Sequence, residues 1–259
     1  MLDITYPPVI WTAKAAFKVL GQRFQLSGTE HVPRKGGVLL AINHTGYVDF
    51  IYAGLGAHPS RRLVRFMIKR EAMDKPGVGH LLRSFHHIRV DRSAGEQSMR
   101  DAVDYLKAGE AVGIYPEATI SRSFEIKELK TGAVRIAAEA GVPLLPVIVW
   151  GAHRLMTKDH PKDFSRSRKT IAVKVGAPLH PTGEDPVAET EQLRTAMARL
   201  LDEVIEDYPA AEKPPGAWWM PARFGGSAPT PEAAARMDAE EKTARARRKA
   251  AEDDDSSSK

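Results

Sequence analysis

The chain has 259 residues, of which 42% are hydrophobic, so it is long enough for one large α/β domain with a real core. It contains no cysteine, which excludes disulfides, a thiol nucleophile and a zinc–thiolate site. The formal net charge of +5 favours anionic partners such as phosphates, anionic lipid headgroups or nucleic acid. Because no run of about 18 apolar residues and no signal peptide is present, we expect a cytosolic chain that at most attaches to a membrane surface.

Residues 1–21 are predicted to hold an N-terminal amphipathic helix that opens at a proline. Its apolar face and the flank beside it carry Ile10, Phe17, Leu20, Trp11, Lys14 and Lys18. A basic helix with a tryptophan suits a membrane interface, but such helices more often cover the sheet of their own domain. Both roles stay open on the sequence alone.

Residues 22–211 alternate between short apolar strands and helices. The expected strands are 24–27, 37–42, 61–69, 87–90, 111–115, 144–150 and 171–175. The expected helices start at 50–55 and continue with 76–85, 97–108, 130–140 and 189–208. This order predicts an α/β domain whose mostly parallel or mixed sheet is covered by helices.

The composition changes near residue 212. Residues 212–229 form a linker rich in proline and glycine, with a tryptophan-rich loop at 218–221. We expect this loop to pack on the domain, with lipid contact as the alternative. Residues 230–259 hold seven Lys/Arg and eight Asp/Glu, so they form a charged tail that is either helical or disordered. A solvated helix is possible over 231–252, and disorder is expected over 253–259.

The polar stretch from Asn43 to Asp49 lies between a buried strand and a helix. On a continuous helix His44 and Asp49 would point about 140° apart, so they meet only if Thr45 and Gly46 form a turn in which the glycine is free to take a positive φ. An imidazole held by a carboxylate can take a proton from a hydroxyl that attacks an electrophile. A polar loop histidine and a helix-capping aspartate are the alternative interpretation.

Residues 61–92 hold nine Lys/Arg and three Asp/Glu, so their local net charge is nine minus three, or +6. Such a run is ordinarily a solvated face. This one ends in Arg89-Val90-Asp91-Arg92 at the end of a predicted strand, where parallel-sheet proteins bind their ligands. Arginine holds phosphate through two parallel hydrogen bonds, which makes Arg92, and less strongly Arg89, a candidate phosphate ligand.

Four blocks over roughly residues 36–150 resemble the glycerolipid acyltransferases, the family that includes 1-acylglycerol-3-phosphate acyltransferase. Asn43-His44 with Asp49 (His-x4-Asp) is similar to the first block, and the strand that ends in Asp91-Arg92 is similar to the second. The third block, Phe-Pro-Glu-Gly-Thr-Arg in the family, resembles Tyr115-Pro116-Glu117-Ala118-Thr119, and the fourth resembles 142–147. The resemblance implies a glycerol-3-phosphate acyltransferase-like fold.

The third block departs from the family pattern at two positions. Ala118 stands in place of the glycine, which puts in doubt any role that needs positive φ or close backbone approach. Ile120 stands in place of the arginine, so the phosphate contact that the resemblance implies either passes to Arg122, two places later, or is lost. Lys130 matches the basic residue that opens the next helix, where an anion site is natural.

The resemblance implies an acyltransferase that uses acyl-CoA or acyl-carrier protein as co-substrate, with no cofactor and no metal. His44 is then the base and Asp49 its partner. The expected ligands of the acceptor, phosphate ligands first, are Arg92, Arg122, Lys130, Arg89, Glu117 and Thr119. No acyl-enzyme is expected, since the chain has neither cysteine nor a Gly-x-Ser-x-Gly elbow.

We expect 1-acyl-sn-glycerol-3-phosphate as acceptor and phosphatidic acid as product, with the chain peripheral to an anionic membrane on its cytoplasmic face. The altered third block leaves another lysophospholipid or an inositol-containing lipid as an alternative acceptor. A non-catalytic relative that docks on anionic membrane through 61–92 is a further alternative. Nucleic acid is not expected as a partner, because the basic stretch lacks interleaved aromatic residues for base stacking.

Overall fold

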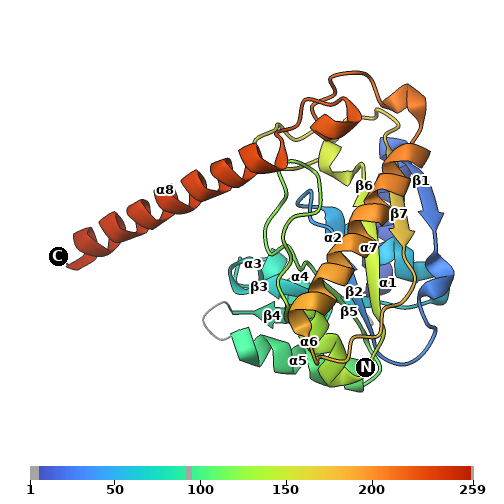
Figure 1. The fold of residues 1–259 in the computed structure, drawn as a ribbon, viewed down its shortest axis with the longest axis vertical. Coiled ribbons are helices and arrows are strands. Elements are labelled where there is room, and N and C mark those ends of the chain that lie inside the picture. The colour runs from blue at the N-terminus through green and yellow to red at the C-terminus, as the bar shows by residue number, and fades with distance from the viewer. Residues whose placement is uncertain (1–5, 92–94, 258–259) are drawn as a thin grey trace.

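The computed structural model describes residues 6–91 and 95–257 (Figure 1). Within them lies a seven-stranded sheet of order β1-β7-β6-β2-β5-β3-β4. Its strands are β1 (Arg23–Ser27), β2 (Val38–Ile42), β3 (Val64–Lys69), β4 (Ile88–Val90), β5 (Ala111–Ile114), β6 (Leu144–Trp150) and β7 (Thr170–Val175). The β6–β7 pair is antiparallel and the other neighbours are parallel, so the sheet is mixed, in agreement with the predicted fold class.

The helices follow the predicted order within a few residues. They are α1 (Tyr6–Leu20), α2 (Asp49–Ala57), α3 (Arg70–Met73), α4 (Val78–Ser84), α5 (Gly95–Lys107), α6 (Gly132–Ala140), α7 (Pro186–Asp207) and α8 (Pro231–Ser257). The one-turn helix α3 was not predicted from the sequence. The charged tail is helical as α8, which continues to Ser257, so the disorder expected from residue 253 is wrong for residues 253–257.

Strand β2 shows how the sheet separates two cores. Leu39 and Ala41 belong to the apolar cluster that α5, α6 and α7 cover. Val38, Leu40 and Ile42 belong to the cluster on the other face, under α1 and α2. All five side chains are fully buried. Because both faces of this largely parallel sheet are covered, its central strands are apolar throughout instead of alternating with polar residues.

The tryptophan-rich loop packs on the domain, as predicted. Trp219 is only 5% exposed and lies against Trp150 and His153, with ring centroids 6.2 and 6.0 Å away. The guanidinium of Arg154 lies over its ring, 4.4 Å from the centroid. Trp218 stacks on His160 at 3.9 Å. The loop therefore closes the end of the α7 side of the core.

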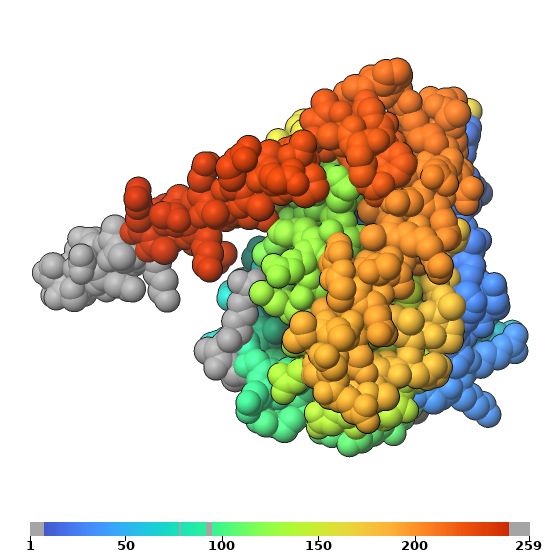
Figure 2. Space-filling model, in the orientation of Figure 1, coloured from blue at the N-terminus to red at the C-terminus, as the bar shows by residue number. Residues whose placement is uncertain are grey.

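The two terminal helices differ in how they meet the body. Phe17 of α1 is buried in the core, whereas Trp11 and Val19 are 74% and 70% exposed. Helix α8 stands off the body beyond its first turns (Figure 1 and Figure 2). None of the described helices is long and apolar enough to cross a bilayer.

Candidate active site

The first and third sequence blocks meet at one edge of the sheet. Strands β2 and β5 are parallel neighbours, so their carboxyl ends lie side by side. The chain leaves β2 into His44 and leaves β5 into Glu117. This is the edge at which open parallel sheets bind ligands.

His44 and Asp49 are in contact across the turn at Thr45 and Gly46, which was the condition for their meeting. Nδ1 of His44 lies 3.2 Å from Oδ2 of Asp49. The same oxygen accepts the backbone N–H groups of Thr45 at 2.8 Å and Gly46 at 2.7 Å. Asp49 is the first residue of α2, so its carboxylate both closes the turn after β2 and fixes the imidazole.

Gly46 is required for a different reason from the one predicted. Its φ is not positive, so the turn does not need the conformational freedom of glycine. A Cβ there would lie 2.8 Å from the carbonyl oxygen of Met156 and 3.0 Å from Cα of His153. The loop after β6 passes too close to admit a side chain, and this approach replaces the predicted positive φ as the reason for glycine.

Asn43 continues the pairing of β2 with β6 through its side chain. Its Nδ2 donates to the carbonyl of Val149 at 3.1 Å, and its Oδ1 accepts the N–H of Val149 at 2.7 Å. The asparagine is fully buried. It therefore anchors the strand end from which His44 projects, a structural role that its place in the motif did not reveal.

Glu117 ties the His44 turn to the loop after β5. Oε1 accepts the backbone N–H of His44 at 2.8 Å, and Oε2 accepts that of Lys127 at 3.2 Å. Burial raises the pKa of Glu117 to about 8, although both N–H donors oppose the rise. Its predicted contact with the acceptor glycerol stays a prediction.

One face of the His44 imidazole is covered by Tyr115. The two ring centroids are 4.4 Å apart and the rings are tilted by 31°. The His44 side chain is 23% exposed, whereas Asp49 is fully buried. With Nδ1 engaged by a carboxylate, Nε2 of such a histidine is left to exchange a proton with a ligand.

Ala118, which stands where the family has glycine, adopts a backbone conformation that ordinarily favours glycine. Its φ is +59°, in the left-handed region. The N–H of Thr119 donates to the carbonyl of Glu117 at 2.8 Å across this turn. A positive φ is therefore accessible to the alanine, at a steric cost of about 1–2 kcal/mol for a residue with a Cβ.

A cluster of cations, Arg122, Lys127 and Lys158, lies beside the loop after β5. Lys127 Nζ donates to Thr119 Oγ1 at 2.8 Å. Arg122 pairs with Asp159 at 2.6 Å, and its side chain is only 9% exposed. We call these three residues the cation cluster. Arg122 was predicted from the sequence, whereas Lys127 and Lys158 were not.

The other predicted phosphate ligands do not join this cluster in the described residues. Arg92 lies outside the part that the structure describes. Arg89 is half exposed and pairs with Asp74 at 2.9 Å. Lys130 is exposed just before α6, and its backbone N–H donates to the carbonyl of Pro116 at 2.9 Å. Their predicted phosphate contacts stay predictions.

Three arginines of residues 61–92 are engaged by other groups of the chain, two within the fold and one at its surface. Arg62 donates to two backbone carbonyls, at 2.9 and 2.7 Å. Arg65 is buried and reaches Glu110 at 3.3 Å. Arg70 bridges to Asp91 at 2.9 Å. The run is therefore neither a bare cationic patch nor a purely solvated face.

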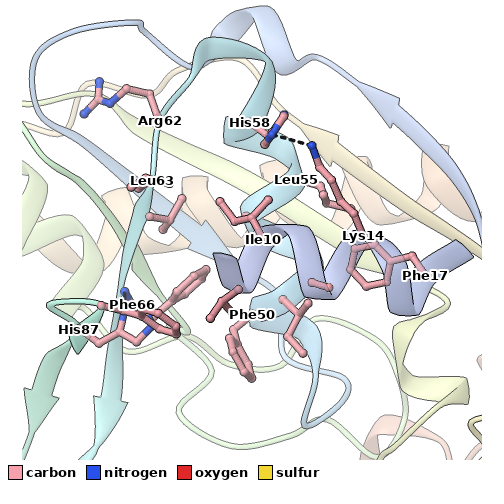
Figure 3. A pocket seen from close by; sticks show the side chains of 16 residues that line it. Ile10, Lys14, Phe17, Phe50, Leu55, His58, Arg62, Leu63, Phe66 and His87 are labelled. Atoms are coloured by element: carbon pink, nitrogen blue, oxygen red, sulfur yellow. Dashed lines mark hydrogen bonds between the residues drawn. The ribbon is translucent and has the colours of Figure 1, made fainter. Parts of the chain in front are cut away.

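An apolar pocket lies between α1, α2 and β3 (Figure 3). It holds about 700 Å³ of space, part of which is open to solvent. Ile10, Phe50, Leu55 and Phe66 line it, and Lys14 lies at its edge, hydrogen-bonded to His58 at 3.1 Å.

No group of three His, Asp or Glu side chains that suits a metal ion occurs within the described ranges. The arrangement at the sheet edge thus consists of an imidazole–carboxylate pair, a buried glutamate and three nearby cations. Such a site can move a proton next to a bound anion.

Comparisons with known proteins agree with the blocks. Residues 23–150 match the family model described as Acyltransferase. The chain is 32% identical over 179 residues to a protein named 1-acyl-sn-glycerol-3-phosphate acyltransferase from Bacillus subtilis, covering 69% of this chain and 84% of the relative. A Pseudomonas aeruginosa protein of the same name is 27% identical over 208 residues, covering 79% and 76%.

The fold also has a solved counterpart. The crystal structure of the 1-acyl-sn-glycerophosphate acyltransferase PlsC from Thermotoga maritima superposes with a TM-score of 0.64. The match covers 78% of this chain and 80% of that chain at 22% identity.

Proposed function

Because the chain belongs to the glycerolipid acyltransferase family, we propose that it transfers a fatty acyl group from an acyl thioester to 1-acyl-sn-glycerol-3-phosphate, which gives phosphatidic acid. The observation that carries this proposal is the His44–Asp49 contact of 3.2 Å at the ligand-binding edge of the sheet. The names of the relatives from Bacillus subtilis and Pseudomonas aeruginosa support the same acceptor.

In the proposed mechanism His44 acts as a general base. Nε2 takes the proton of the acceptor hydroxyl while the hydroxyl oxygen attacks the thioester carbonyl carbon. The tetrahedral intermediate collapses, the carbon–sulfur bond breaks, and the imidazolium returns the proton to the leaving thiolate. Asp49 stabilises the imidazolium in between, across the Nδ1–Oδ2 contact.

The cations near His44 suit the phosphate of the acceptor. Arg122 offers a planar fork for a phosphate group, and Lys130 stands before the N-terminus of α6. Arg92 and Arg89 remain proposed ligands from the second block. Thr119 and Glu117 are proposed to hold the glycerol from the loop after β5.

The acyl chain of the donor is proposed to enter the apolar pocket between α1, α2 and β3 (Figure 3). Its side chains are mostly hydrocarbon, which a fatty chain requires. Phe50 and Ile51, which line it, follow Asp49 directly on α2, so the pocket and the imidazole pair share one helix. Acyl-CoA and acyl-carrier protein are both suitable donors, and neither needs a further cofactor.

We propose that the enzyme is a peripheral protein that binds the anionic surface of the cytoplasmic face of a membrane. Trp11 and Val19 of α1 are largely exposed, and Lys14 and Lys18 lie on the same helix. Aromatic and basic side chains of this kind favour the headgroup region of an anionic leaflet.

The test is a thioester-release assay in which the same donor is offered with lysophosphatidate, lysophosphatidylinositol or lysophosphatidylcholine. We expect the highest kcat/KM with lysophosphatidate, and a loss of about 10²- to 10⁴-fold in His44→Ala. Preference for the inositol lipid would move the assignment to that acceptor. Vesicle binding without thioester release from any acceptor would make the chain a non-catalytic lipid-binding relative.

A further inference from the structure

The cation cluster is occupied by carboxylates from the C-terminal helix. Glu241 of α8 accepts from Arg122 at 2.7 Å and from Lys158 at 2.9 Å. Asp238, one turn earlier on the same helix, pairs with both Arg122 and Lys127. Two carboxylates three residues apart lie on one face of a helix, so α8 presents them together.

This cluster is part of the same unit as the imidazole pair. Lys127 donates its backbone N–H to Glu117, and Glu117 accepts the backbone N–H of His44. Lys127 also donates through Nζ to Thr119 at 2.8 Å. Asp238 of α8 therefore binds a lysine whose backbone is joined to that of His44 through the carboxyl group of Glu117.

Without the carboxylates of α8, the net charge of the cation cluster and Asp159 is about equal and opposite to that of a phosphate monoester. The body supplies three cations and one carboxylate, Asp159, which pairs with Arg122. Two positive charges are then left, and a phosphate monoester carries about −1.5 to −2 near neutral pH. Asp238 and Glu241 supply the same two negative charges from one side of α8.

Helix α8 is held mainly by these ion pairs. Among its described side chains, Ala234 is the one that is buried, and residues beyond Asp238 are exposed up to 248. The turns that Figure 2 draws in red project away from the body. Asp238, Lys127 and Glu241 are partly exposed, so salt weakens these ion pairs, and a phosphate monoester of about the same total charge can compete with the two carboxylates.

We propose that Lys127 and Lys158 complete an acceptor-phosphate site with Arg122, and that Asp238 and Glu241 occupy this site as an internal ligand until the acceptor displaces them. The proposal rests on the proposed function for the identity of the acceptor. Because the acceptor binds only those molecules in which the site is free, its apparent affinity is the intrinsic affinity multiplied by the fraction of such molecules.

The first experiment removes the internal ligand in the full chain. We expect Asp238→Asn/Glu241→Gln to lower the KM for lysophosphatidate by about five- to twentyfold, since two carboxylates no longer compete. Glu240→Gln is the matched control, because Glu240 is exposed on the same helix and is not among the described contacts of the cluster. Its KM should equal that of the unmodified chain.

The second experiment removes the cations. Lys127→Gln and Lys158→Gln should each raise the KM for lysophosphatidate. They should also raise it when combined with Asp238→Asn/Glu241→Gln, because in that background the lysines no longer have a structural role as ion-pair partners of α8. A KM that is unchanged or higher in Asp238→Asn/Glu241→Gln overturns the proposal, provided that thermal unfolding shows an intact fold.

A binding measurement separates this proposal from the proposed function. Titration of glycerol 3-phosphate by calorimetry needs no acyl transfer. Tighter binding by Asp238→Asn/Glu241→Gln than by the unmodified chain supports the internal ligand even if lysophosphatidate is not acylated. Equal binding overturns it even if lysophosphatidate is acylated.

Discussion

Replacing Asp49 by asparagine should separate the chemical role of its charge from its role in the fold. An asparagine oxygen in the place of Oδ2 keeps acceptors for the N–H groups of Thr45 and Gly46 and for Nδ1 of His44. The fold of the turn is then retained, while the negative charge opposite the imidazolium is lost.

The magnitude follows from the 3.2 Å contact between Nδ1 and Oδ2. At this separation two unit charges interact with about 5 kcal/mol at an effective dielectric constant of 20. The N–H groups of Thr45 and Gly46 on the same oxygen, and the partial exposure of His44, reduce that value. We therefore expect a loss of about 3–4 kcal/mol of transition-state stabilisation, or roughly 10²- to 10³-fold in kcat.

The assay is the initial rate of thioester release at saturating acceptor, together with urea unfolding. Asp49→Ala is the companion variant, because it leaves the buried N–H groups without an acceptor and should cost about 2–6 kcal/mol of folding free energy. Asp49→Asn should cost far less. A kcat within threefold of the unmodified chain in a folded Asp49→Asn would refute the role of Asp49 as a charged partner of His44.

Three further variants test other parts of the structure. Because the pKa of Glu117 is raised to about 8 from an ordinary 4.5, the folded chain holds a proton that the unfolded chain has released, and stability falls as pH rises through this window. Urea unfolding from pH 5 to 8 should show this fall, up to about 1.4 kcal/mol per pH unit, and Glu117→Gln should lack it. Ala118→Gly relieves the left-handed φ of +59° and should raise Tm by about 2–4 °C, whereas no gain would show that the turn carries no strain. Gly54→Phe adds a ring to open space in the apolar pocket and should shift the donor preference toward shorter chains, with Gly54→Ala as the control that leaves most of the pocket free.

The sequence was sufficient for those parts of the site that are local. Short apolar runs were enough to predict the strands of the sheet, because strands that are buried on both faces are apolar throughout. The contact of His44 with Asp49 was expected only if Thr45 and Gly46 formed a turn, and the resemblance to the His-x4-Asp block favoured that turn over a continuous helix. The reason for Gly46 was wrong, because the close approach comes from Met156, more than a hundred residues away.

The parts that the sequence did not predict depend on long-range contacts. Lys127 and Lys158 looked like ordinary exposed lysines. They lie on the loops that follow β5 and β6, two strands that β2 separates, and both reach Asp238 of α8. Asp238 and Glu241 sit in a tail of mixed charge without a motif. Their place opposite Arg122 depends on how the preceding tryptophan-rich loop packs, which no local pattern encodes.

Glu117 joins two backbone segments through one carboxyl group, and this limits how the site can diversify. A shift of the loop that carries Lys127 would pull on the N–H of His44 through the same side chain. We therefore expect substitutions to change the preference for a lipid headgroup readily only at residues that are not joined to His44 through Glu117. Such residues lie on α8 and on the loop after β6. Designers who wish to retarget the acceptor should vary those outer positions and leave the shared carboxyl untouched.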